Sequence, residues 1–255
     1  LGAGKRLYGQ QAAPWFHPRR VPRRTSERIP SMITRGIALL TALILAGCVQ
    51  HKRVELFPPK PDLPYRAWYV GLGAPDYMEA WVDGVDLTDV NDLMYERVFG
   101  GVASTSTPPD NRGDAHGWPK RPGPGSQFPM SGIDLPEKIT VRWQSLAEPE
   151  AYRASINVPK WVRDEMRTER RVFCRFDNDF ILEYRSIIAI GVAPGGVAKF
   201  WLMGSCLDPM EIGRVQGEVN PVGPYNGTSN GEFYRPPSPN AQHYIDTHGI
   251  PFGSW

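Results

Sequence analysis

The strongest constraint on the fold is a strict alternation of apolar and polar residues in two neighbouring stretches. In KITVRWQS, residues 138–145, the apolar residues are Ile139, Val141 and Trp143. In AYRASINV, residues 151–158, they are Tyr152, Ala154, Ile156 and Val158. Successive side chains of a strand point to opposite faces, so each stretch is expected to be a half-buried strand. The LAEPE segment between them is short enough for a hairpin connection.

Three further stretches indicate the same β-rich organisation. RAWYVGLGA, residues 66–74, reads as a strand, and SIIAIGVAPGGVAKFWLMG, residues 186–204, reads as two strands around the turn at Pro194. The first of these two is almost entirely apolar, which predicts a central strand buried on both faces. PKWVRDEMRTERR, residues 159–171, predicts a helix with Pro159 in its first turn, packed on a sheet edge. The expected fold is mainly β, an antiparallel sheet or sandwich-like domain with one or two helices and long Pro/Gly-rich loops.

Two segments lack any periodicity. Residues 104–132 are expected to form a long loop, and residues 221–255 an irregular Pro/Gly-rich tail. Trp118 and Phe128 are aromatic residues among polar neighbours in the loop, a combination that is enriched at binding hot spots, so we expect them to contact a partner. The alternative is that Trp118 folds back to cover the sheet.

Residues 32–48, MITRGIALLTALILAGC, have the three parts of an export signal: the positive Arg35, an apolar run, and small residues before a cysteine. Leu45, Ala46 and Gly47 before Cys48 fit the lipobox of bacterial lipoproteins. The alternative, a membrane-spanning or buried helix, is disfavoured because the run of about ten apolar residues is shorter than the roughly twenty that cross a bilayer. We expect residues 32–47 to be a signal peptide, and Cys48 to carry acyl chains such as palmitate.

Residues 1–31 contain seven Arg or Lys and one Glu. They would suit a nucleic-acid-binding arm, but an export signal normally begins the chain, so we interpret them as a spurious upstream extension. Eight of the 29 basic and one of the 27 acidic residues precede Cys48, which leaves 21 basic and 26 acidic groups after processing. The mature chain is therefore acidic, and no nucleic-acid partner is expected.

The segment after the lipobox predicts where the protein is held. Residues 48–64 are rich in proline, which favours an extended spacer between membrane and domain. Val49 replaces the Asp that retains many lipoproteins in the inner membrane. By resemblance to sorted lipoproteins, we expect anchoring in the inner leaflet of the outer membrane, facing the periplasm.

Cys174 and Cys206 are the two cysteines besides Cys48. An oxidising periplasm favours a disulfide between them, and the alternative is a pair of buried free thiols.

The chain shows no motif with the spacing that catalysis or metal binding needs. Gly71-Leu72-Gly73 lacks the third glycine of a dinucleotide loop and is interpreted as a turn at a strand end. The aspartates at 83, 86, 89 and 92 are three apart, unlike a calcium loop, and predict a solvated, turn-rich segment. His243 and His248 lack zinc-site spacing and are assigned to the exposed tail, and Ser205 lacks a nucleophile elbow. We expect no catalytic residues, no metal and no cofactor.

Three blocks carry a resemblance to a known family. They are YVGLGAPDYMEAWVDGVDLTDV, ITVRWQSLAEPEAYRASINVPKWVRDEM and IAIGVAPGGVAKFWLMG. Together they resemble the proteobacterial lipoprotein family catalogued as domain of unknown function 2931, over residues 65–220. The resemblance implies an exported lipoprotein and supplies no catalytic residues.

Two functions from different classes follow as hypotheses. The first is non-catalytic binding of a protein, in one form an immunity protein that neutralises an envelope toxin delivered by a type VI secretion system. The second is an envelope or cell-wall hydrolase with an unrecognised site.

Overall fold

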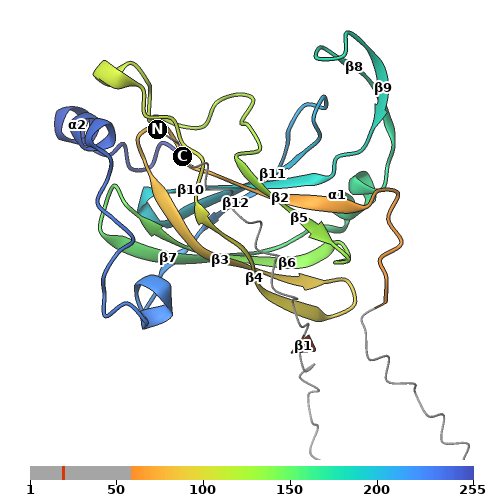
Figure 1. Cartoon of the computed structure of the whole chain (residues 1–255), viewed down its shortest axis with the longest axis horizontal. Helices are drawn as coiled ribbons and strands as arrows, with labels where there is room; N and C mark the ends of the chain where they lie inside the picture. The colour runs from red at the N-terminus through yellow and green to blue at the C-terminus, as the bar shows by residue number, and fades with distance from the viewer. Residues whose placement is uncertain (1–18, 21–58) are drawn as a thin grey trace, which may run out of the picture.

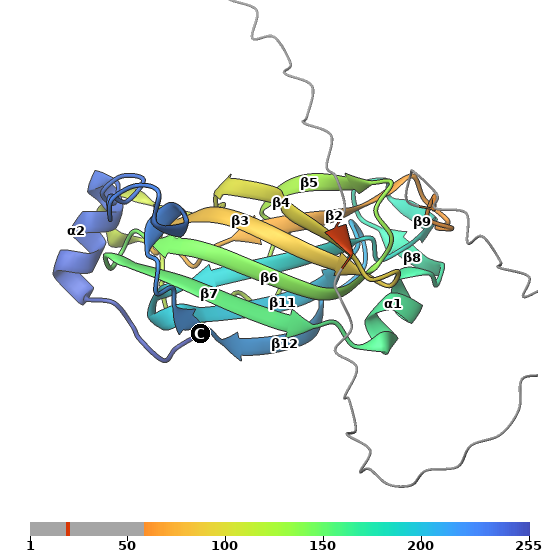
Figure 2. The same cartoon turned by 90° about the horizontal axis from the view of Figure 1, so that it is seen from below.

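The computed structural model describes residues 59–255 and the backbone of Arg19–Arg20. Two β-sheets stack face to face as a sandwich (Figures 1 and 2). The first sheet has the order β1 (Arg19–Arg20), β4 (Leu93–Val102), β3 (Ala80–Asp89), β6 (Pro136–Ser145), β7 (Glu150–Asn157) and β13 (Glu218–Val219). The second has the order β12 (Met210–Gln216), β11 (Val197–Met203), β10 (Ile187–Ala193), β2 (Ala67–Gly73) and β5 (Ser126–Ser131).

The remaining elements lie at the two ends of the sandwich. They are a separate hairpin of β8 (Arg170–Cys174) and β9 (Asp179–Glu183), the helices α1 (Lys160–Met166) and α2 (Pro239–His248), and the short 3-10 helices η1 (Pro109–Asn111), η2 (Pro194–Gly196) and η3 (Pro224–Gly227). The hairpin rises at one end and α2 lies at the other (Figure 1). None of the helices within residues 59–255 is long and apolar enough to cross a membrane.

The core lies between the two sheets and takes alternate residues from each strand. Trp68 and Leu72 of β2, Val141 and Trp143 of β6, and Phe200 of β11 are all fully buried there. Side chains that alternate along a strand reach opposite faces, so each strand gives about half its residues to this core. The mainly β, sandwich-like fold is as the sequence predicts.

The two clearest sequence patterns are confirmed. β6 and β7 form the expected antiparallel hairpin, with Val141 opposite Ala154 and Trp143 opposite Tyr152. All seven residues of β10 are buried, because β10 is flanked by β11 and β2 and covered on both faces. The pairing of β10 with β2 is parallel, although the sheets are otherwise antiparallel in the described pairs.

Three expected segment boundaries are wrong. The loop predicted over 104–132 contains β5, which pairs with β2 at the sheet edge. The helix predicted over 159–171 ends at Met166, and Arg170 already begins β8. The tail predicted to be irregular over 221–255 contains α2, whose Tyr244 is buried.

The acidic series is also placed differently from the prediction. Asp83, Asp86 and Asp89 lie on β3, and Asp86 and Asp89 are buried. Asp86 pairs with Arg142 of β6, while Asp89 accepts hydrogen bonds from the backbone N–H groups of Asn91 and Leu93. A buried carboxylate is stable when such partners satisfy it, so these residues shape the sandwich and its turn.

Candidate binding surface

The β8–β9 hairpin is the most exposed apolar structure in the described chain. Its two strands pair Arg171 with Leu182 and Phe173 with Phe180. The turn between them contains Asn178, whose φ of 52° is left-handed, a conformation that asparagine tolerates well. The sequence signals for this hairpin are a short run of β-formers on each side of Asp-Asn-Asp.

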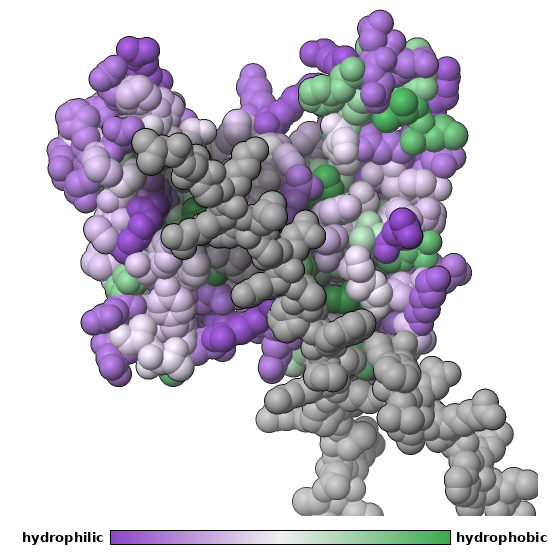
Figure 3. Space-filling view, in the orientation of Figure 1, coloured by the Kyte–Doolittle hydropathy of each residue, from purple (hydrophilic) through white to green (hydrophobic). Residues whose placement is uncertain are grey.

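The two faces of the hairpin differ sharply. Val172, Cys174 and Ile181 point toward the body of the protein and are buried or half-buried. The opposite face, which we call the hairpin face, consists of Arg171, Phe173, Phe180 and Leu182 and is exposed. Leu182 has 63% of its surface exposed, and Phe176 in the turn has 90%. Figure 3 shows this apolar surface at the upper right, over β8 and β9.

The rings of the hairpin face contact one another. Phe173 and Phe180 lie edge to face with their centroids 5.4 Å apart. The Arg171 guanidinium lies over the Phe180 ring, 4.3 Å from its centroid. Such contacts restrict the side chains before any partner arrives, which lowers the entropy cost of binding.

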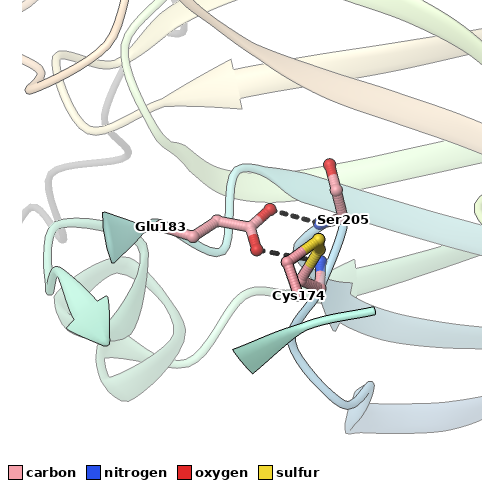
Figure 4. Close-up of a disulfide and its surroundings, with 4 residues drawn as sticks. Cys174, Glu183 and Ser205 are labelled. Atoms are coloured by element: carbon pink, nitrogen blue, oxygen red, sulfur yellow. Dashed lines mark hydrogen bonds between the residues drawn. A yellow bond between two sulfur atoms is a disulfide. The ribbon is translucent and has the colours of Figure 1, made fainter. Parts of the chain in front are cut away.

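The base of the hairpin is fixed to the loop after β11 at two points. Cys174 forms a disulfide with Cys206, in the loop after β11, as expected from the sequence. The Glu183 carboxylate accepts hydrogen bonds from the backbone N–H groups of Ser205 and Cys206 (Figure 4). Ser205 therefore serves as a backbone donor at this junction.

A groove lies between the hairpin, the loop after β11 and the loop before β5. Its volume is about 800 Å³. Its apolar lining comprises Val172, Phe173, Phe176, Ile187, Met203 and Leu207. Phe173 belongs to both the groove and the hairpin face, so the two meet at this residue.

The groove carries charge at its rim. Arg121 and Asp208 form an ion pair at 2.8 Å, and their side chains are 66% and 72% exposed. Arg175 also lines the groove and makes no hydrogen bond or ion pair with any other described residue. The groove thus combines an apolar floor with a guanidinium that has no partner among residues 59–255.

The loop aromatics expected to contact a partner both pack on the sandwich. Trp118 lies edge to face against Trp201, with ring centroids 5.1 Å apart, and covers the backbone at Gly191. Phe128, on β5, stacks on Phe99 at 5.5 Å. Both side chains are half-buried. Trp118 therefore lies as the alternative interpretation expects, folded back over the sheet. Contact of Trp118 and Phe128 with a partner stays a prediction.

Trp118 lines a second cavity, of about 490 Å³, on the other side of the same loop. The loop passes very close to the sheet at Gly71, where a Cβ atom would lie 1.9 Å from the Pro124 carbonyl oxygen. Gly71 is thus a position of close approach within β2, and the turn predicted there is wrong.

One histidine lies beside a carboxylate at the rim of this cavity. His116 Nδ1 lies 2.7 Å from Asp114 Oδ1, which also accepts the His116 backbone N–H, and both side chains are exposed. The backbone and side-chain hydrogen bonds from His116 lower the pKa of Asp114. A pair this local and this exposed to water forms a turn, and it lacks the buried orienting partner that a catalytic base needs.

The remaining candidates for chemistry have structural explanations. Among the described residues, one group of three metal-ligand types lies close together, Cys174, Asp177 and Cys206, and its two sulfurs are joined in the disulfide. His243 and His248 are exposed residues of α2.

Burial raises the pKa of Asp83, against hydrogen bonds from Gln144 and the Tyr225 backbone that lower it, and burial likewise raises the pKa of Asp89. Both carboxyls accept hydrogen bonds inside the fold.

The lipobox residues Leu45, Ala46 and Gly47 and the expected acylation site Cys48 lie outside the described residues.

The model of a family described as "Protein of unknown function (DUF2931)" matches residues 50–253. The chain belongs to this family. The DUF2931 match extends on both sides of the resemblance seen over 65–220, and it adds α2 and most of the expected tether. No curated protein matches the chain, and no solved structure matches it either.

Proposed function

We propose that this DUF2931 protein is a non-catalytic binding protein, anchored by a lipid on Cys48 in the inner leaflet of the outer membrane and facing the periplasm. The proposed contact surface is the hairpin face with Phe176. The observation that carries the proposal is the exposure of four large apolar side chains, Phe173, Phe176, Phe180 and Leu182, on one fixed hairpin.

The energetics favour a partner for this hairpin. Burying a Phe or Leu side chain fully is worth about 1.5–3 kcal/mol relative to leaving it in water. Single exposed apolar residues are common, but a contiguous exposed patch marks an interaction site. Because the disulfide and Glu183 fix the base, the hairpin meets its partner largely ordered.

The specific form that we propose is an immunity protein that neutralises a type VI secreted envelope toxin. An inhibitor of this kind needs a rigid, exposed surface and no active site of its own. The alternative, an envelope or cell-wall hydrolase, is supported by no arrangement among residues 59–255, and we keep it as an outcome of the test.

The test compares Phe176→Ser with Phe252→Ser in the full-length protein. Both residues are exposed phenylalanines, at 90% and 57%, so both variants are expected to keep the wild-type stability within about 0.5 kcal/mol. Co-expression with candidate envelope toxins measures protection, and co-purification with them measures binding. Phe176→Ser should lose both, and Phe252→Ser should lose neither.

Two results would count against the proposal. Equal protection and binding by the two variants would remove the hairpin from the interface. Turnover of a lipid or glycan substrate by the pure wild-type protein would favour the hydrolase.

A further inference from the structure

We infer that the groove beside the hairpin binds an extended segment of a partner protein in which a carboxylate side chain lies next to apolar side chains. This inference rests on the proposed function and adds the chemistry of the bound segment. The juxtaposition that carries it is the unpaired Arg175 above an apolar floor.

The charges around the groove leave one exposed cation without an ion pair among the described residues. Asp208 is already paired with Arg121, and Glu183 is held by the N–H groups of Ser205 and Cys206. Arg185, close to the base of the hairpin, is paired with Glu165 at 2.6 Å. Arg175 is left with no partner among the described residues.

The acidic residues of the hairpin turn lie outside the lining of the groove, although the Asp177 carboxylate lies within 4.8 Å of the Cys206 sulfur. Asp177 and Asp179 do not line the groove, and Asp179 accepts a hydrogen bond from the Phe180 backbone N–H. Two guanidinium groups and one carboxylate therefore line the groove. This excess of positive charge favours an occupant with a carboxylate, because a guanidinium binds a carboxylate through two parallel hydrogen bonds.

The apolar lining determines what must lie beside that carboxylate. Ile187 and Met203 form a floor that is almost fully buried, whereas Phe173 and Phe176 form an exposed wall. An apolar side chain inserted against this wall would remove both rings from water and shield the ion pair from solvent. Shielding strengthens the attraction between guanidinium and carboxylate.

The shape of the surface favours a polypeptide over a small molecule. The groove meets the hairpin face at Phe173, and Phe180 and Leu182 of that face are also exposed. An occupant that covers both regions must extend along the hairpin, as a peptide segment does when alternate side chains reach a surface. In such a segment, an acidic residue would pair with Arg175 while a neighbouring apolar residue packs against Phe173 and Phe176.

The experiment selects binding sequences from a random-peptide library displayed on phage, using the purified full-length protein as bait. Wild type is compared with Arg175→Glu, with Phe176→Ser, and with the control Arg112→Glu, an exposed arginine in the loop at η1. Wild type and Arg112→Glu should select peptides enriched in Asp or Glu beside apolar residues. Arg175→Glu should lose this enrichment and bind the selected peptides about tenfold more weakly.

The outcomes separate this inference from the proposed function. Peptides that need Phe176 but show no acidic enrichment, or that bind Arg175→Glu equally well, would overturn the inference and leave hairpin binding intact. Absence of any peptide sensitive to Phe176→Ser would overturn both. Binding of phosphatidylglycerol vesicles in place of peptides, with the same sensitivity to Phe176→Ser, would identify the surface as lipid-binding and also overturn both.

Discussion

Cys174, at the end of β8, is bonded to Cys206, in the loop that follows β11, with their Cα atoms 5.1 Å apart. This bond connects the separate two-stranded hairpin to the larger sandwich. The exposed aromatic side chains of the hairpin therefore take their position from a covalent link as well as from packing.

The disulfide predicts a measurable share of the stability. It joins residues 32 positions apart, and replacing both cysteines by serine should lower the free energy of unfolding by roughly 3–4 kcal/mol, because the unfolded chain gains entropy. Urea denaturation measures the change. Reductant should lower wild-type stability to that of the variant and leave the variant unaffected, and equal midpoints for the oxidised wild type and the variant would contradict the prediction.

The ion pair between Asp86 and Arg142 predicts a larger effect than exposed pairs do. Their side chains are only 10% and 12% exposed, so Asp86→Asn removes the ion-pair partner of a buried guanidinium and should cost about 3–5 kcal/mol. The matched control is Glu218→Gln, which breaks the exposed pair with Arg153 and should cost about 1 kcal/mol or less. Similar losses of thermal stability in the two variants would show that burial of the first pair is not decisive.

Glu79 predicts a dependence of stability on pH. Burial alone would raise its pKa, but hydrogen bonds from Arg235 and Ser238 outweigh burial and lower the pKa below 4.5. A carboxyl with a lowered folded-state pKa stabilises the fold above its unfolded pKa, and that contribution is lost as pH falls through the folded value.

The stability advantage of wild type over Glu79→Gln should therefore be full above pH 4.5 and shrink at lower pH. Asp83 and Asp89, whose raised pKa values act in the opposite direction, are common to both proteins and cancel in this difference. Urea denaturation midpoints of the two proteins, measured at a series of acidic pH values, test this difference in stability. A difference that is constant with pH would exclude Glu79 as the source.

The lipobox predicts the fate of Cys48. Cys48→Ala, expressed from Met32, should yield unprocessed or mislocalised protein, because acylation requires the thiol. Membrane fractionation and mass spectrometry of the amino-terminal peptide measure this. A variant that is still acylated in outer-membrane fractions would end the lipoprotein interpretation, and peptides from residues 1–31 made from the native locus would overturn the assignment of Met32 as the start.

The sequence predicts those parts of the fold in which local pattern and burial agree. The alternation through Trp143 and Tyr152 is enough to place β6 and β7, and the apolar run of β10 indicates its central position. The edge strand β5 is not predicted from the sequence, because Pro129 interrupts its run of strand-forming residues. A strand at a sheet edge tolerates proline.

The errors at α1 and α2 have a local origin. The charged run after Met166 continues a helical composition although β8 begins at Arg170. At α2, the prolines on either side of Ser238 suggested coil, whereas a serine N-cap followed by proline is a helix-start signal.

The binding surface is harder to predict from sequence than the fold. The two cysteines of the expected mature domain favour the bond between Cys174 and Cys206, but the sequence leaves two buried free thiols as an alternative, and the structure decides for the disulfide. Phe200 lies in the apolar run VAKFWLM and is fully buried, whereas Phe176 lies between Arg175 and Asp177 and is exposed, so local sequence separates these two. That Phe173, Phe180 and Leu182 are exposed together on one face depends on which other segments pack nearby, so it appears only in the tertiary structure.

The parallel pairing of β2 with β10 has a consequence for how the chain acquires its structure. Tyr69 lies opposite Ile187, so an early strand must wait for a distant one before its sheet is complete. Contacts between residues so far apart slow folding, because the intervening loop must close first. A chain that emerges with its amino end first would hold β2 with one edge open until β10 follows. We therefore expect assembly to be slow and concerted, and to require protection of the nascent chain from aggregation.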